Sequence, residues 1–283
     1  AQEGSLVPAG YAAVRARFSR LRGELREAAA WAREGLRDAS GDASCRTELA
    51  LAAAQSGDAA SAREAVAGCP DLDEPTAWLL AARGDVDGAL AAIGDATDGM
   101  VQRYGDGSDR MAIGSDSAFA LYDAVRLGAP EKVAERLPAD GVFALHAEAL
   151  ARGDGSALDR AAEALEGRGF LLFAAEAHAQ AVRAHRDPRA ARTSRTRAVA
   201  LARRCQGART PALSGLVLGE LTARQRQIVT LAAAGLSNRQ IAEQLTLSIR
   251  TVGNHLYSAY ARLGASDRGA LPWLVELPDA QPA

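Results

Sequence analysis

Three helix-length segments follow one another in the last quarter of the chain, and each begins at a residue that can cap a helix. Thr222 is followed three residues later by Gln225, and Ser237 by Gln240. Both pairs fit the capping box, in which the hydroxyl accepts from the third helical amide and the glutamine side chain bonds back to the cap. Ser248 stands in the same position before the third segment. The spacing therefore predicts three short helices in succession.

The joint between the second and third segments is short, because only Thr246 to Ser248 are left over. A joint of this length forces a sharp angle and predicts a helix-turn-helix. Gly235 is placed to end the first helix in a left-handed C-cap. Apolar residues of the third segment recur at helical spacing, so one side of that helix is expected to pack on the other two. These residues are Val252, Leu256, Ala259, Tyr260 and Leu263.

The opposite side of the third segment offers amide, hydroxyl and guanidinium groups and no carboxylate. It consists of Arg250, Gly253, Asn254, Tyr257 and Ala261, flanked by Thr251, His255, Ser258 and Arg262. Such a surface suits the major groove of DNA, because asparagine can pair in two places with an adenine edge and arginine and hydroxyl groups bind phosphate. Glycine allows close approach. An ordinary three-helix cluster with a solvated polar face is the alternative that periodicity alone leaves open.

This segment resembles the C-terminal helix-turn-helix domain of LuxR-type transcription regulators. The matching residues, in register over about fifty positions, are Leu221-Thr222-Ala223-Arg224, Gly235-Leu236-Ser237-Asn238, Ile241-Ala242, Ser248, Thr251-Val252, His255 and Arg262-Leu263. The chain departs from the family pattern at Gln225 and Gln240, where glutamate is usual, and at Gly253, where lysine or glutamate is usual. Glutamine still closes a capping box, whereas Gly253 removes a side chain that often touches DNA in the family.

The resemblance implies double-stranded DNA as the partner and a recognition helix at about 248–263. The predicted base-facing residues are Asn254, Tyr257, Gly253 and Arg250. The predicted contacts to the DNA backbone are Thr251, His255, Ser248, Asn238, Arg239, Arg224, Ser258 and Arg262. In the family a fourth helix usually pairs two domains, which implies a homodimer on DNA. Ser266 can cap such a helix, although Pro272 within it requires the helix to be short, broken or restarted.

Helical patterns rich in alanine dominate residues 1–205, and glycine joints separate them. The joints are Gly23-Glu24, Gly57-Asp58, Gly84-Asp85, Gly128-Ala129 and Gly153-Asp154, with Arg186-Asp187 in the same role. Gly23 to Gly57 and Gly153 to Asp187 each span 34 positions, whereas Gly57 to Gly84 spans 27 and Gly128 to Gly153 spans 25. The pattern resembles a degenerate array of tetratricopeptide repeats, which would stack as a solenoid. The glycine-rich stretch from Gly94 to Ser117 predicts a loop, or one short helix around Met100 to Tyr104.

The sequence therefore predicts an all-α protein. A tetratricopeptide-like helical-hairpin solenoid, residues 1–205, precedes a Gly- and Pro-containing linker, 206–219, and a small four-helix LuxR-type domain, 220–283. This combination is similar to the C-terminal half of the large ATP-binding, MalT-like LuxR regulators. Their N-terminal nucleotide-binding module has no counterpart here, because no Gly-x-x-x-x-Gly-Lys occurs. Either that module was removed or the protein lacks it.

Charge and composition limit the alternatives. The net charge is −2, so there is no global attraction for nucleic acid, and pairing of two domains would strengthen DNA binding. The arginine-rich stretch 186–204 is either a solvated helix face or an extra contact to the DNA backbone. Cys45, Cys69 and Cys205 lie far apart without a Cys-x-x-Cys, which indicates buried thiols in a reducing cytoplasm. No metal-ligand spacing and no apolar run of membrane length occurs.

We expect a cytoplasmic, sequence-specific transcription regulator that needs no cofactor or metal. Its repeats would serve as a sensory and oligomerisation module for a protein or small-molecule effector. An enzyme is not expected, because paired carboxylates, a Cys-His set and a nucleophile elbow are missing from any credible context. The alternative is a protein-interaction scaffold whose terminal three-helix unit mediates assembly only. That alternative predicts no salt-dependent affinity for DNA.

Overall fold

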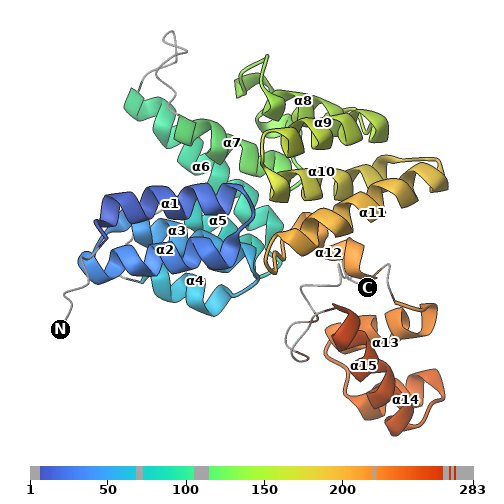
Figure 1. The fold of residues 1–283 in the computed structure, drawn as a ribbon. Helices are drawn as coiled ribbons and strands as arrows, with labels where there is room; N and C mark the ends of the chain where they lie inside the picture. Colours follow the sequence, from blue (N-terminus) through green and yellow to red (C-terminus); the bar gives the residue numbers. More distant parts are fainter. Residues whose placement is uncertain are drawn as a thin grey trace. The chain divides into compact units, whose positions relative to one another are not determined.

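The computed structural model describes residues 7–67, 73–104, 115–218, 221–263, 268 and 271, and the regular structure within them is entirely helical, as predicted (Figure 1). The chain forms two compact units, which consist of residues 1–212 and 213–283. No helix of the described residues is both long enough and apolar enough to cross a membrane.

The first unit is built from helical hairpins. Its helices are α1 (Ala9–Leu21), α2 (Leu25–Asp38), α3 (Ala43–Gln55), α4 (Ala59–Val66), α5 (Asp73–Ala81), α6 (Val86–Tyr104), α7 (Ser115–Arg126), α8 (Val142–Ala151), α9 (Gly155–Gly167), α10 (Leu171–Ala184) and α11 (Pro188–Arg204), with 3-10 turns η1 (Pro130–Lys132) and η2 (Ala134–Arg136). Neighbours in sequence pack side by side, as Figure 1 shows for α1 with α2 and for α10 with α11. This is the solenoid-like arrangement of hairpins that the sequence predicts.

A glycine followed by aspartate forms the turn of several hairpins. At Gly57 the backbone is left-handed, with φ +79°, which favours glycine. Its amide donates to Ala54 O at 3.0 Å and that of Asp58 to Ala53 O at 2.9 Å, the two bonds of a Schellman motif. The Asp58 carboxylate then accepts from the amide of Ser61 at 3.0 Å and caps α4. The same pair of backbone bonds closes the helices that end before Gly23, Gly84, Gly128 and Gly153.

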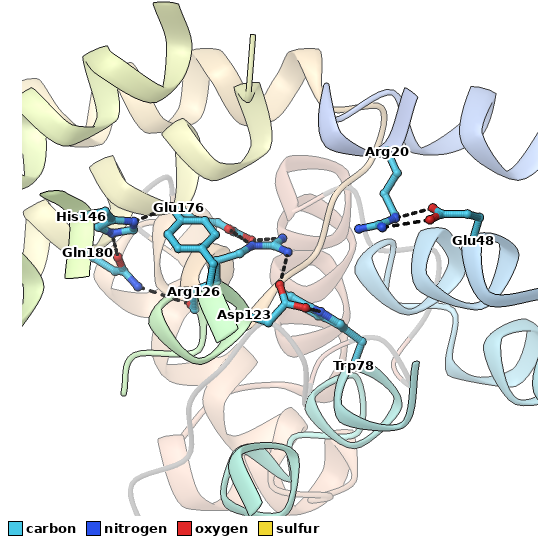
Figure 2. A network of polar contacts seen from close by, with 9 residues as sticks. Arg20, Glu48, Trp78, Asp123, Arg126, His146, Glu176 and Gln180 are labelled. Carbon is cyan, nitrogen blue, oxygen red and sulfur yellow. Dashed lines mark hydrogen bonds and ion pairs between the residues drawn. The ribbon is translucent and has the colours of Figure 1, made fainter. Parts of the chain in front are cut away.

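Helices α1, α2 and α3 approach one another closely because their contact surfaces are small side chains. A Cβ atom on Gly35 of α2 would lie 2.7 Å from the Cβ of Ala12 and 2.5 Å from the Sγ of Cys45. A buried ion pair also joins α1 to α3, with Arg20 donating to both carboxylate oxygens of Glu48 at 2.6 and 3.1 Å (Figure 2). Small residues therefore set the spacing of these helices, and a charged pair fixes their register.

A second buried polar network, centred on Arg126 of α7, joins three hairpins (Figure 2). Arg126 donates to Glu176 of α10 at 2.7 and 3.0 Å and to Asp123 at 2.8 Å. The other oxygen of Asp123 accepts from the indole of Trp78 on α5 at 2.7 Å. The guanidinium lies 4.3 Å from the ring centres of both Trp78 and Phe173. Removal of Arg126 would leave two buried carboxylates without their cation, which is strongly destabilising.

His146 of α8 lies in the same interior and is neutral. Its Nε2 lies 2.6 Å from the side-chain oxygen of Gln180, whose amide nitrogen donates to Val125 O at 3.0 Å. Because that oxygen must accept, Nε2 carries the proton, and Nδ1 accepts from the Tyr122 hydroxyl at 2.6 Å. Burial lowers the pKa of His146 from 6.5 to about 4.

Two segments, one predicted as a loop and one as a linker, contain more helix than the sequence predicts. Helix α6 continues through Gly94 to Tyr104, so the short helix expected around Met100 to Tyr104 is present as the end of a longer one. The burial of Leu90 and Ile93, within one turn of Gly94, offsets the low helix propensity of that glycine. Part of the predicted linker is helix α12 (Pro211–Leu218), which begins with proline at its first position and buries Leu216. Residues 105–114 of the predicted loop lie outside the described residues.

The second unit contains α13 (Ala223–Ala233), α14 (Asn238–Leu245) and α15 (Ile249–Leu263) around one apolar core. The core residues come from all three helices, from the residues before α13 and from those after α15. They are Leu221, Ile228, Val229, Ala232, Ala233, Ile241, Ala242, Val252, Leu256, Ala259 and Leu271. The fourth helix predicted after Ser266 lies outside the described residues, apart from Arg268 and Leu271.

Gly→Ala substitutions should have opposite effects on stability at a left-handed turn and inside a helix. At Gly84, where φ is +85° and a Cβ would meet no atom within 4 Å, alanine introduces only backbone strain and should destabilise by about 1–2 kcal/mol. At Gly94, inside α6, alanine should stabilise by roughly 0.5–1 kcal/mol. Urea unfolding of the two variants and the wild type measures both effects. Equal stability of the two variants would contradict this role of the turns.

His146 predicts a loss of stability in mild acid. Because its pKa is lower in the folded chain than in the unfolded chain, the unfolded chain takes up the extra proton as the pH falls from 6.5 to about 4. The stability lost across this window is about 3 kcal/mol, and it is retained above pH 6.5. In His146→Gln the free energy of unfolding should change less steeply with pH, because unfolding then takes up close to one proton fewer. Urea unfolding at several pH values checks this, and identical slopes for variant and wild type would exclude His146 as the cause.

Candidate nucleic-acid interface

Local hydrogen bonds define where α13 and α14 begin. The Thr222 hydroxyl accepts from the amide of Gln225 at 3.2 Å, and the Gln225 side-chain oxygen accepts from the amide of Thr222 at 3.1 Å. Ser237 and Gln240 form the same reciprocal pair at 3.3 and 2.8 Å. Both predicted capping boxes are confirmed, so glutamine closes them as the usual glutamate would.

The turn between α14 and α15 consists of residues 246–248, as predicted. Thr246 has the left-handed backbone, with φ +53°, and the amide of Leu247 donates to Ala242 O at 2.8 Å. The Ser248 hydroxyl accepts from the amide of Thr251 at 3.0 Å and so caps α15. The two side-chain hydroxyls also lie 2.7 Å apart. This short, bonded turn holds the two helices at a sharp angle.

The inner side of α15 is the apolar side that the spacing predicts. Val252 and Ala259 are fully buried and Leu256 nearly so, in one cluster with Ile228 of α13 and Ile241 of α14. Because α15 is fixed on this side, rotation about its axis would expose the core, and its outer side is determined.

The outer side presents the predicted base-facing residues to solvent. Arg250 and Asn254 are exposed, and 79 % of the surface of Tyr257 is accessible. Gly253 is half-buried, and a Cβ there would meet no atom within 4 Å. Ile249 is 54 % exposed one and two helical turns before Gly253 and Tyr257, so these three form one ridge with its low point at the glycine. Ile249 is not among the predicted base-facing residues; its signal in the sequence is an apolar residue off the buried stripe, directly after the N-cap.

The predicted contacts to the DNA backbone surround this side. Ser248, Ser258 and Arg239 are exposed, while Thr251 and His255 are half-buried. Arg239 forms an exposed ion pair with Glu243 at 3.2 Å. The side chain of Arg262 lies outside the described residues.

Two of the predicted backbone contacts also have structural partners. Arg224 donates to the Leu245 carbonyl, in the last turn of α14, at 2.7 Å and to the Gln227 side chain at 2.9 Å. It thereby joins α13 to the C-terminus of α14, where a positive charge also complements the helix dipole. The side-chain oxygen of Asn238 accepts from Arg268 at 2.9 Å, and Arg268 also donates to the Leu236 carbonyl. These long-range bonds are not predicted from the sequence.

Positive charge is concentrated in this part of the chain. Residues 221–263 contain five arginines and one acidic residue, Glu243, a net charge of +4, although the whole chain carries −2. A positive three-helix unit with a carboxylate-free outer helix has the electrostatics that binding to phosphate requires.

The capped helices, the short turn and the exposed side of the third helix define a helix-turn-helix domain. Residues 219–272 match the family model described as bacterial regulatory proteins, luxR family. This part of the chain is therefore a LuxR-type helix-turn-helix domain, the DNA-binding domain of transcription regulators. The resemblance to the large ATP-binding regulators stays a prediction.

The relatives match the chain over a short stretch. A segment of 71 residues is 44 % identical to Rv0890c of Mycobacterium tuberculosis, and 51 residues are 49 % identical to YhjB of Escherichia coli; both are named as predicted HTH-type transcriptional regulators. The matches cover 25 % and 18 % of this chain but only 8 % and 26 % of those relatives. No solved structure matches the chain.

The two partners of Arg224 predict that it stabilises the domain. Arg224→Gln removes the bond to Leu245 O and should lower the free energy of unfolding by about 1–2 kcal/mol. Arg239→Gln is the matched control, because it removes only an exposed ion pair and should cost less than about 0.5 kcal/mol. Thermal unfolding followed by circular dichroism compares the two. Equal melting temperatures of the two variants would show that Arg224 does not stabilise the domain more than an exposed ion pair does.

Proposed function

We propose that this protein is a sequence-specific transcription regulator that places the outer side of α15 in the major groove of DNA. The observation that carries the proposal is the exposed, carboxylate-free surface of Arg250, Asn254 and Tyr257 on a helix whose other side is locked in the core. An α-helix fits the major groove, where each base pair has its own pattern of donors and acceptors.

The roles of the individual residues follow from their chemistry and position. Asn254 would bond to an adenine edge and Arg250 to guanine or phosphate, while Ile249 would pack against a thymine methyl group. Gly253 would let the backbone of α15 approach the bases between Ile249 and Tyr257. The surrounding hydroxyl, imidazole and guanidinium groups would bind phosphate and orient the helix: Ser248, Thr251, His255, Ser258, Asn238, Arg239, Arg224 and Arg262.

We further propose that two copies bind together in the cytoplasm on an inverted repeat whose half-sites lie about one helical turn apart. A single domain, residues 220–283, holds six arginines and five acidic residues, a net charge of only +1, so pairing of two domains would raise the affinity. The hairpins of the first unit would sense an effector and control this pairing.

Selection of bound DNA from a random pool by the full-length chain tests the function. An enriched motif, together with affinity that falls steeply as salt rises, is the expected result. Failure to enrich any motif and affinity that does not depend on salt would contradict the proposal and favour a scaffold whose terminal unit mediates assembly only.

Two substitutions separate base reading from phosphate binding. Asn254→Ala should lose about 1–3 kcal/mol of discrimination at one base pair of the selected site. Arg239→Ala, at an exposed position predicted to contact phosphate, should weaken binding to all sequences and lower the slope of log affinity against log salt by about one. Gln244→Ala, at an exposed position of α14, is the control and should bind as the wild type does. An unchanged base preference in Asn254→Ala would show that Asn254 does not recognise a base.

A further inference from the structure

A cavity of ≈ 960 Å³ lies in the first unit, bordered by α1, α7, the α9–α10 turn and the end of α11. The volume is within the range of sites that hold small molecules, about 300–1,000 Å³. All its lining residues belong to the first unit, so the cavity does not depend on where the DNA-binding domain lies.

Phenylalanine is concentrated at this cavity. The chain has only five phenylalanines, and three of them, Phe18, Phe119 and Phe170, line it. Phe119 and Phe170 meet edge to face with their ring centres 6.1 Å apart, and Phe170 stacks on the buried Phe173 at 5.4 Å. Phe18 is 63 % exposed, and Val14, also in the lining, is 53 % exposed on the same helix. The wall is therefore an apolar surface that protein does not cover in the described part of the chain.

The rim of the cavity is positive. Its lining contains Arg17, Arg22, Arg168 and Arg204 but only one acidic residue, Glu166, a net charge of +3. Glu166 pairs with Arg204 at 3.4 Å, and Glu24, outside the lining, pairs with Arg22 at 3.3 Å. Arg168 has no acidic partner among the described ion pairs and donates to a backbone carbonyl at 3.2 Å. The guanidinium of Arg17 lies over the ring of Phe119 at 5.5 Å. Guanidinium groups next to exposed rings suit a ligand that is both apolar and anionic.

We propose that this cavity binds a small amphipathic anion, a molecule with an aliphatic chain and one carboxylate or phosphate head. The chain would lie against Phe18, Phe119 and Phe170, and the head would bond to the arginines of the rim, Arg168 among them. A protein partner is disfavoured because a stable protein interface uses about 20–30 residues on each side, whereas thirteen residues line this cavity.

This site names the class of effector that the first unit would sense. Only the effect of the ligand on DNA binding rests on the proposed function. Phe170 of the lining stacks on Phe173, which packs against Arg126, the cation that joins α5, α7 and α10. A bound ligand would thus contact the side chains next to the network that fixes these hairpins. Binding itself is measured without DNA, so its failure and the failure of DNA recognition are separate results.

Calorimetric titration of the full-length chain with four ten-carbon compounds tests the head group. Decanoate, decyl phosphate or both should bind at one per chain, with decanol at least about tenfold weaker and decyltrimethylammonium weaker still. A preference between the two anions identifies the head. Decanol binding as tightly as the anions, or no saturable binding by either anion, would overturn the proposal, and so would binding of an acidic amphipathic peptide in place of both anions.

Substitutions in the cavity then test its location. Phe18→Ser alters an exposed side chain and should weaken binding of the preferred anion by about tenfold. Arg168→Glu should weaken binding of the anion and strengthen that of the cation. The controls outside the lining are Leu145→Ser, at a 40 % exposed position of α8, and Arg63→Glu, at an exposed position of α4, and both should bind as the wild type does. Wild-type affinity in both cavity variants would overturn the assignment.

Discussion

The burial of one side of α15 determines what the second unit can do. Val252, Leu256 and Ala259 fill the space between α13 and α14, and the three-residue turn prevents α15 from sliding along them. Since the apolar side is committed to the core, Asn254 and Tyr257 must face solvent. The polar surface is therefore held by the packing of the opposite side, which is the preorganisation that recognition of a rigid duplex needs.

In the first unit, too, buried contacts fix the positions of the helices, but different residues make those contacts. Its interior consists mainly of alanine, which brings the helices close together but offers few distinctive shapes to fix their register. Buried charged and polar pairs supply that register, through Arg20 with Glu48 and through Arg126 with Asp123 and Glu176 (Figure 2). Phe119, Phe143, Phe170 and Phe173 pack on one another beside the second network, and two of them, Phe119 and Phe170, also line the ligand-sized cavity.

Features set by neighbours in sequence could be predicted from the sequence, and those set by distant residues could not. The capping boxes at Thr222 and Ser237 span three residues each and are found as predicted. The bond from Arg224 to Leu245 crosses 21 residues, and no local pattern announces it. At Gly94 the local glycine content favours a loop, whereas the burial of Leu90 and Ile93 in the preceding turn favours helix, and the chain there is helical. The DNA contacts themselves stay predictions.

Chemical probing of the two grooves measures most directly whether α15 reads bases. Dimethyl sulfate methylates guanine N7 in the major groove and adenine N3 in the minor groove of the DNA that the chain selects. If the outer side of α15 enters the major groove, binding will protect guanine N7 within each half-site and leave adenine N3 reactive. Protection confined to adenine N3, or no protection of either atom in a saturated complex, would contradict the account.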